Sequence, residues 1–358
     1  MIPIQDARNI FTKAVVGVYE ENIPAPSFLR SFFTTKTAVT KEVSIEVRRD
    51  TEKIAVDVLR GTDGNRNQFT RHSEKIFVPP FYNEYFDITA LERYDRAFGH
   101  PEAGDYPTIG LLADEVGGKL LKLRNKIERA KERQCAQVFE TGIVELKNGD
   151  NIDYKRRAES LVDLGSGGYW SDPTAPVEDQ LIAGAKFIRN KGKNVYPELV
   201  LVLSSEGWAN LKRTNWFDNE AKFVKVTLLD VNMPAQVGAT GAVYAGRMTA
   251  GAYIYNVYLY DEVYTDETGT TKPYLPTNKA VILPVQGHSF LMQHAGVPAI
   301  LADTTQAEFN EYIGMIAGEY YVNNYIERKR KAHIFELYSA PLALPVSVDM
   351  IYTMQVLA

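Results

Sequence analysis

Alternating apolar and polar positions mark the first regular structure along the chain. Val43, Ile45 and Val47 alternate with polar residues, and positions 54, 56 and 58 repeat the pattern. A period of two predicts strands with one buried face. A polar, glycine-containing run at 60–67 follows, and the chain returns through an apolar stretch at 68–81. The pattern predicts a two-stranded ribbon with a charged tip. Such a ribbon needs support from another surface, because isolated hairpins are marginally stable in water.

A helical period replaces this alternation over residues 107–142. Apolar residues there recur at intervals of three or four, which predicts one helix of roughly 50 Å. Gly117-Gly118 is a candidate kink or close-packing point within it. The apolar positions are Leu112, Val116, Leu120, Leu123, Ile127 and Ala130.

The second half of the chain mixes the two periods. A short strand is expected at 143–146, and after the glycine-rich run 165–168 the pattern predicts a helix at 176–191, a buried strand at 198–203 and a helix that opens at 204–208. Strand and helix alternation of this kind is typical of an α/β region. Strand patterns return at 243–283, with a hairpin turn at 266–270, and again at 325–338 and 350–357. The pattern over the whole chain therefore predicts an α+β protein.

The segment 1–36 has little core of its own and is expected to form an arm. Phe28, Phe32 and Phe33 lie close together in it, and exposed rings of this kind need a covering surface. Two alternatives stay open: the rings pack on a neighbouring subunit or on their own domain. The 21 Tyr and 16 Phe of the chain fit either strand-rich structure or extensive interfaces.

Composition excludes several classes of protein. The formal net charge is -5, so the protein as a whole is not an electrostatic DNA coat. No run approaches about 18 apolar residues, so no membrane span is expected. The single cysteine, Cys135, excludes an internal disulfide framework and fits a protein made in a reducing cytoplasm.

Catalytic patterns are sparse. His288 and His294 are six residues apart, which is a weak metal signal, and the glycine run 165–168 lacks the Gly-Lys-Ser ending of a phosphate loop. No Gly-x-Ser-x-Gly elbow occurs, and nothing beside Cys135 indicates an activated thiolate. We therefore expect no enzyme activity, no cofactor and no metal. A rival hypothesis, a β-rich hydrolase or sugar-binding module, requires tryptophans and carboxylates in one cleft, whereas the tryptophans are scattered at 170, 208 and 216.

Several short segments carry a family resemblance, in the same order over nearly the whole chain. They are 26–33 (PSFLRSFF), 244–247 (YAGR), 258–260 (YLY), 272–276 (KPYLP), 339–348 (SAPLALPVSV) and 355–358 (QVLA). Together they resemble the major capsid protein E family of tailed bacteriophages, the family of the phage lambda major head protein. The resemblance implies the α+β capsid fold of the Hong Kong 97 type. It places an N-arm at 1–50, an E-loop hairpin at 51–90, a peripheral domain at 91–175 with a spine helix at about 107–142, an axial domain at 176–284 and a return to the peripheral domain at 285–358.

The resemblance also implies a function. The chain would be a structural subunit that assembles in the bacterial cytoplasm, as pentamers and hexamers, into the icosahedral shell of a virion. Its expected partners are other copies of itself, a scaffold, a portal, a decoration protein and, through non-specific contact, the packaged double-stranded DNA. A nanocompartment shell of the same fold, which encloses a cargo enzyme, is the alternative.

Two sets of residues are candidates for these contacts. The proposed intersubunit anchors are Phe28, Leu29, Phe32, Phe33, Phe69, Phe77, Phe81 and Tyr82. The basic residues that would face DNA or a scaffold are Lys119, Lys122, Arg124, Lys126, Arg328, Lys329, Arg330 and Lys331. Charge on a helix is more often a solvated face, and salt bridges between subunits are the other alternative for these cations.

Overall fold

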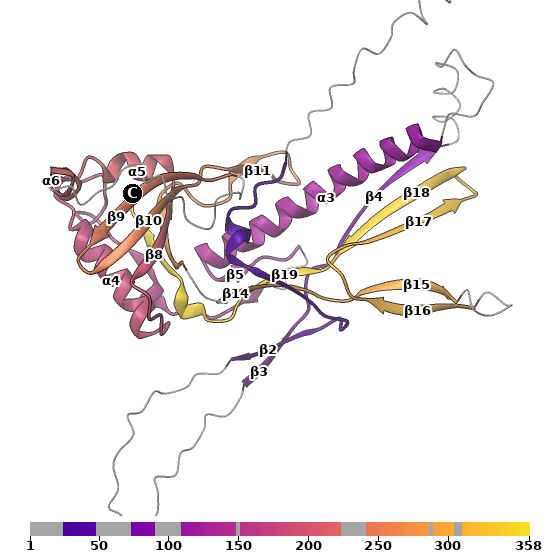
Figure 1. Cartoon of the computed structure of the whole chain (residues 1–358), viewed down its shortest axis with the longest axis horizontal. Helices are drawn as coiled ribbons and strands as arrows, with labels where there is room; N and C mark the ends of the chain where they lie inside the picture. The colour runs from indigo at the N-terminus through magenta and orange to yellow at the C-terminus, as the bar shows by residue number, and fades with distance from the viewer. Residues whose placement is uncertain are drawn as a thin grey trace, which may run out of the picture.

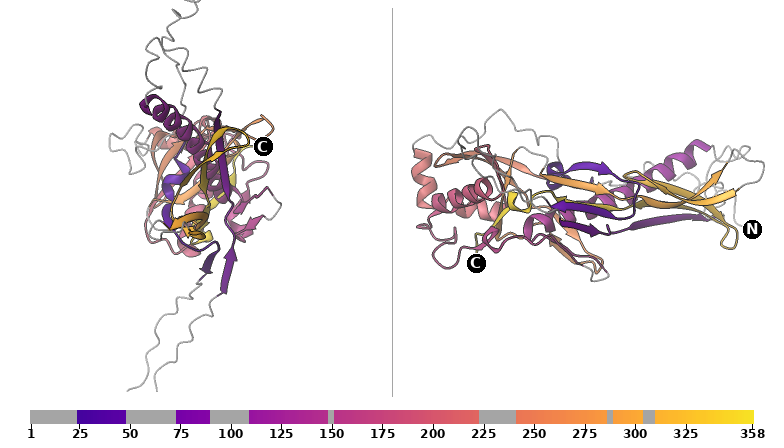
Figure 2. Two further views of the ribbon diagram at one scale, coloured as in Figure 1. Left: turned by 90° about the vertical axis from the view of Figure 1, so that its right-hand side faces the viewer. Right: turned by 90° about the horizontal axis from the view of Figure 1, so that it is seen from below.

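The computed structural model describes residues 24–47, 73–89, 109–147, 151–222, 241–285, 289–303 and 310–358. The chain is elongated. An α/β body lies at one end, and a long helix with several β-hairpins extends from it (Figures 1 and 2). The chain is thus a mixed α+β protein, as its periodicity predicts.

A six-stranded sheet, in the order β7-β20-β13-β8-β10-β9, forms the centre of the body. The central strand β8 (Glu198–Leu203) is apolar from its second residue onward and buried there, as expected for a strand covered on both faces. The other strands are β7 (Leu161–Asp163), β9 (Val243–Ala250), β10 (Tyr253–Leu259), β13 (Lys279–Pro284) and β20 (Tyr352–Gln355).

The α/β body also contains three helices. Helix α4 (Val177–Asn190) buries Val177, Leu181 and Ile188, which share one helical face. Helix α5 (Ser205–Leu211) begins after Ser204, whose side chain accepts a hydrogen bond from the Gly207 backbone N–H as a helix N-cap does. Helix α6 (Asn215–Lys222) follows.

Helix α3 (Ile109–Glu140) links the body to the elongated part and confirms the predicted long helix. Its 32 residues span about 48 Å at 1.5 Å per residue. The C-terminal end is buried, with Cys135, Ala136 and Phe139 at zero exposure. A three-stranded sheet, in the order β1-β14-β19, packs beside this end. Its strands are β1 (Thr34–Thr37), β14 (Phe290–His294) and β19 (Pro341–Pro345).

A second three-stranded sheet, β17-β18-β4, lies along the exposed part of α3. Its strands are β4 (Tyr82–Thr89), β17 (Tyr321–Glu327) and β18 (Ala332–Ser339). The strand predicted over 325–338 is thus interrupted by a turn at 328–331, whose four consecutive basic residues are exposed to solvent.

The remaining strands form two-stranded pairs. Strands β2 (Val43–Val47) and β3 (Ser73–Phe77) pair in antiparallel register, which agrees with the base of the predicted ribbon; its middle lies outside the described residues. The predicted turn at 266–270 joins β11 to β12. The other pairs are β5 (Ile143–Val144) with β6 (Ile152–Asp153), β11 (Val263–Thr265) with β12 (Thr271–Pro273), and β15 (Val297–Asp303) with β16 (Asn310–Ile316). Short 3-10 turns are η1 (Leu29–Phe32), η2 (Ala158–Ser160) and η3 (Val348–Met350).

Candidate intersubunit surfaces

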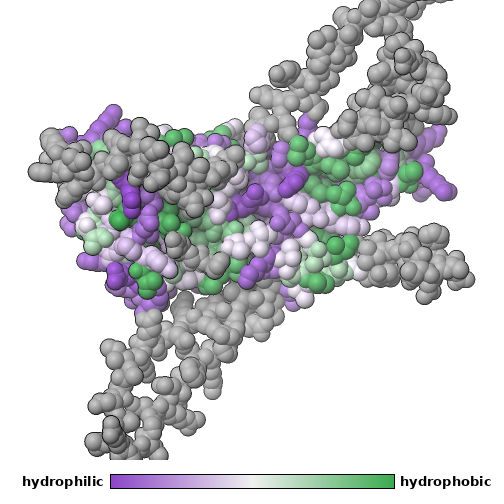
Figure 3. Space-filling view, viewed as in Figure 1, coloured by the Kyte–Doolittle hydropathy of each residue, from purple (hydrophilic) through white to green (hydrophobic). Residues whose placement is uncertain are grey.

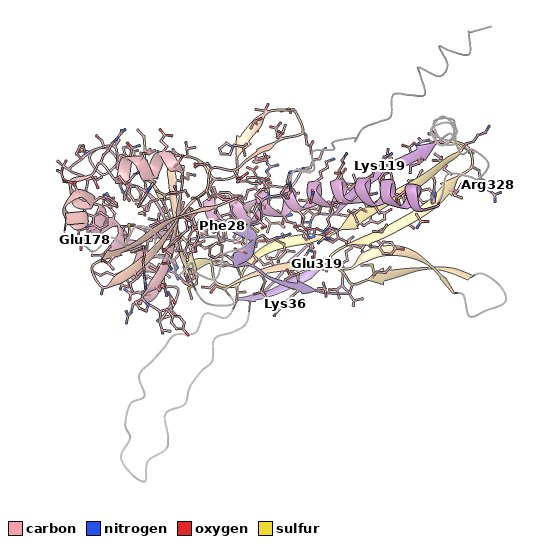
Figure 4. All side chains as sticks on the ribbon, turned by 45° about the horizontal axis from the view of Figure 1, so that its top comes forward. Phe28, Lys36, Lys119, Glu178, Glu319 and Arg328 are labelled. Atoms are coloured by element: carbon pink, nitrogen blue, oxygen red, sulfur yellow. The ribbon has the colours of Figure 1, made fainter. Side chains whose placement is uncertain are left out.

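The aromatic segment of the arm packs into its own chain. Phe28 is 1% exposed, and its ring lies 5.0 Å from that of Tyr258 and 5.7 Å from that of Tyr260. Phe33 contacts Phe139 and Phe290 at 5.2 and 5.4 Å between ring centroids. Figure 4 shows Phe28 where the arm crosses α3.

These contacts decide between the two alternatives for the arm. Phe28, Leu29 and Phe33 are buried in the core of their own subunit, so the expectation that they are intersubunit anchors is corrected. The physical reason is that the end of α3 and strand β10 offer an apolar surface that covers the rings within one chain. Phe32 is only partly buried, against Phe28 and Phe139.

A buried carboxylate on α3 holds the same segment. Glu132 accepts hydrogen bonds from the backbone N–H groups of Leu29 at 2.8 Å and Arg30 at 3.0 Å, and from the Tyr260 hydroxyl at 2.9 Å. Burial raises the pKa of Glu132 to about 7, although these three hydrogen bonds oppose the shift. One side chain thus joins the arm, the helix and the residue that follows β10. No sequence pattern indicates this role, since Glu132 is one of many charged residues on a long helix.

The aromatic residues at the base of the ribbon have different environments. Phe77 packs against Tyr154 at 5.7 Å, and the Tyr82 hydroxyl accepts a hydrogen bond from the Gln134 amide at 2.9 Å. Phe81 is 49% exposed and stacks on Tyr338. Phe69 lies outside the described residues. Among the described candidates at this base, Phe81 therefore presents the most ring surface to solvent.

Phe81 belongs to a larger aromatic surface on the β17-β18-β4 sheet. Tyr82, Glu84 and Phe86 of β4 face α3, as their contacts with Gln134, Lys126 and Lys119 indicate. The alternate residues of the strand point the other way. The strand register places five aromatic residues on this outer face, which we call the aromatic face. They are Phe81, Tyr85, Tyr321, Tyr325 and Tyr338.

This face is partly exposed. Tyr85 and Tyr325 are 59% and 43% exposed. Figure 3 shows apolar residues at the surface of the elongated part, near α3 and the β15–β16 hairpin. This face was not predicted from the sequence. The available signal was β4 itself, where the neighbours Tyr85 and Phe86 place an aromatic ring on each side of one strand.

The two groups of predicted basic residues lie at the same end of the molecule, where Figure 4 shows Lys119 and Arg328. Those on α3 contact their own chain: Lys119 lies over the Phe86 ring, Arg124 over the Tyr320 ring, and Lys126 pairs with Glu84 at 2.7 Å. Lys122 is exposed. The turn residues Arg328, Lys329, Arg330 and Lys331 are all exposed, and Arg330 pairs with Glu327 at 3.6 Å.

No arrangement for catalysis emerges within the described residues. They contain no group of three or more metal-binding side chains, and no helix among them is long and apolar enough to cross a membrane. His288 lies outside the described residues, so the weak His288 and His294 signal has no structural support. Trp170 and Trp208 are buried in the core of the α/β body, and Trp216 packs against it, which removes the cleft that the hydrolase or sugar-binding hypothesis needs.

Comparison with known proteins decides the family. The family model described as phage major capsid protein E matches residues 12–356, which is nearly the whole chain. The chain belongs to the phage major capsid protein E family. It is accordingly a structural component of the virion and not an enzyme. Subunits of this protein self-assemble into the icosahedral head shell.

Solved structures agree with this assignment at the level of fold. A protein assigned as a prophage capsid protein from Escherichia coli CFT073 has a TM-score of 0.57 and 18% identity, and the match covers 94% of this chain and 96% of that one. The mature capsid of bacteriophage PhiM1 gives 0.49 and 11%, covering 95% and 90%. An encapsulin from Synechococcus elongatus PCC 7942 gives 0.47 and 13%, covering 99% and 95%. Of these three similarities the first alone exceeds 0.5, and it shows that the capsid subunit shares the prophage protein's fold. No curated protein sequence matches the chain significantly.

Proposed function

We propose that the capsid subunit uses the subdivision of the Hong Kong 97 type. Residues 1–50 would form the N-arm, 51–90 the E-loop, 91–175 the peripheral domain around α3, 176–284 the axial domain, and 285–358 the return to the peripheral domain. Two observations support this layout: α3 connects an α/β body to an elongated part, and strands β18 and β19 pack against α3 after the chain has left the body.

The observation that carries the proposed mode of assembly is the aromatic face. An exposed cluster of tyrosines with one phenylalanine is unusual on a protein that works alone, whereas tyrosine and phenylalanine are enriched in interfaces. The face is firmly shaped, because Glu336 at its centre accepts hydrogen bonds from the Asn323 amide and the Tyr325 and Tyr338 hydroxyls. We propose that it packs on a neighbouring subunit in the pentamers and hexamers of the shell, with Phe81 as one anchor.

Replacement of the rings tests this proposal. Tyr85→Ser with Tyr325→Ser should lower the thermal unfolding temperature of the unassembled subunit only slightly, because both side chains are about half exposed. It should greatly reduce the yield of shells measured by sedimentation velocity and negative-stain microscopy. The matched control, Tyr85→Phe with Tyr325→Phe, keeps the rings and should assemble nearly as the wild type does. Normal shells from the serine variant would refute the role of the face.

For the exposed turn at 328–331 we propose non-specific contact with packaged double-stranded DNA. Four adjacent cations with one internal carboxylate partner provide the positive charge that phosphates require. Lys331 adopts a positive φ of 49°, which asparagine tolerates well, so Arg328→Gln, Lys329→Gln and Lys331→Asn can be combined without added backbone strain. DNA affinity should fall, and the slope of log K against log salt should decrease by up to about 0.9 for each phosphate that the variant no longer neutralises.

A control of equal charge distinguishes the turn from general electrostatics. Lys186, Arg189 and Lys191 are exposed on and just after α4, and their replacement by glutamine removes the same charge from the α/β body. Equal losses in both variants would contradict a local DNA contact. Unchanged DNA binding combined with abolished binding of an acidic scaffold would assign the turn to the scaffold. Portal and decoration proteins stay proposed partners by family resemblance.

A further inference from the structure

A polar cavity lies at the junction of the arm, α3, β14 and the turn before β17. Its volume is about 170 Å³, ample for several waters or a small ion. Arg30 comes from the arm, Arg124, Glu128 and Lys131 from α3, His294 from β14, and Glu319 from the turn. Figure 4 shows Glu319 beside the middle of the helix. Four segments that are distant in sequence thus meet around one space.

His294 is the residue that this junction leaves unexplained. It is 1% exposed, and neither ring nitrogen has a hydrogen-bond partner of good geometry, although the Lys36 backbone approaches the ring. A buried polar group without a partner costs about 1–3 kcal/mol, and such groups are rare in native proteins. The apolar neighbours Phe33 and Met292 offer the ring no partner. A hydrogen-bonding occupant of the cavity would resolve the deficit.

The charged residues around the cavity indicate whether the occupant is an anion or a cation. Glu128 is already engaged by Arg30, Lys131 and the Tyr320 hydroxyl. Glu319 is 45% exposed and 4.0 Å from the Lys131 ammonium. The lining therefore has three cations, Arg30, Arg124 and Lys131, against two carboxylates. Glu128 is already ion-paired with Arg30 and Lys131, and Glu319 faces solvent. The excess of positive charge and of N–H donors favours a negatively charged ligand.

We propose that this cavity binds a compact oxyanion, either phosphate or a carboxylate. The N–H of a neutral His294 ring would donate to it from β14, and the Lys131 ammonium and the Arg124 guanidinium would donate from α3. Because Arg30 of the arm also lines the space, the anion would tie the arm, the helix and the sheet together. This binding does not depend on the assembly contacts proposed above and can be measured on the unassembled subunit.

Binding should couple to protonation. Without an anion, burial lowers the pKa of His294 to about 4 and that of Lys131 to about 7. A bound anion raises both values, so binding takes up protons and weakens as the pH rises above about 7. The other charged or titratable groups at or beside the site are Arg30, Arg124, Glu128, Cys135, Glu319 and Tyr320.

Isothermal titration calorimetry with inorganic phosphate and with acetate, at constant ionic strength and pH 6.5, tests the proposal. The unassembled wild-type subunit should bind at least one of these anions at a single site. His294→Leu should weaken binding about ten- to a hundredfold, the equivalent of one hydrogen bond to a charged group. It should also unfold at a temperature no lower than the wild type in the absence of anion, since it removes an unpaired polar ring. Lys36→Gln changes a side chain on the exposed strand β1 that does not line the cavity, so it should bind as the wild type does.

The outcomes separate the sources of the anion. If the added anion binds the free subunit but shows no binding to assembled shells, the site in the shell is occupied by a carboxylate of a neighbouring copy. Sites that titrate equally in both states would assign a free anion. The proposal is overturned if neither anion binds the wild type, or if His294→Leu binds as tightly as Lys36→Gln. Shell formation by the same variants is measured separately, so failure of the assembly proposal would leave this result intact.

Discussion

Truncation of Phe28 distinguishes an intramolecular clasp from an intersubunit anchor. Its ring is almost fully buried and lies within 5.0–5.7 Å of the rings of Tyr258, Phe32 and Tyr260. Removal of a buried phenylalanine costs about 3–5 kcal/mol, to which aromatic pairs contribute about 0.5–1.5 kcal/mol each. Because typical proteins are stable by only about 5–15 kcal/mol, Phe28→Ala should remove a large part of the subunit's stability.

Urea denaturation of the unassembled subunit, followed by tryptophan fluorescence and circular dichroism, measures this loss. Phe28→Ala should shift the midpoint markedly, whereas Phe81→Ala, the same truncation of a half-exposed ring, should cost less than about 1 kcal/mol. Any assembly defect of Phe28→Ala then follows from a destabilised subunit. If its midpoint matches the wild type while shells no longer form, the intramolecular interpretation is refuted and the intersubunit role of the arm is restored.

Two further predictions concern particular side chains. Gly184→Ala in α4 should destabilise the protein by about 1–3 kcal/mol, because the new methyl group would lie 2.6 Å from Ile282 and 2.9 Å from Tyr352. Gly117→Ala in α3 meets no atom within 4 Å and should stabilise by about 0.5–1 kcal/mol; thermal unfolding compares the pair, and a loss of stability in Gly117→Ala would contradict the helix argument. The third prediction concerns pH. Since the folded pKa of His294 is about 4 against 6.5, the unfolded chain binds more protons between these values. Stability should therefore fall as the pH drops from about 6.5 to 4, by at most about 3 kcal/mol. His294→Gln should show a shallower decline, and an identical pH profile would exclude this residue as the cause.

Elements with a strong local period were predictable from the chain. Residues 109–140 repeat apolar positions at helical spacing, and residues 198–203 form an almost unbroken apolar run, so helix α3 and strand β8 were predicted within two residues of their ends. Short segments distributed over the whole chain were enough for the family resemblance, which the family model confirms. These features depend on neighbours in sequence and therefore need no knowledge of the tertiary structure.

Which residues each side chain contacts was decided by the tertiary structure. Glu132 meets the Leu29 backbone across 103 residues, and no periodicity relates two such positions. The arm's rings were ambiguous for the same reason, because a short aromatic segment without a period does not specify which apolar surface covers it. The aromatic face and the His294 cavity likewise exist only where separate strands and a helix come together. Local patterning determines which elements form, whereas burial, pairing and charge at their junctions depend on contacts between residues far apart in the chain.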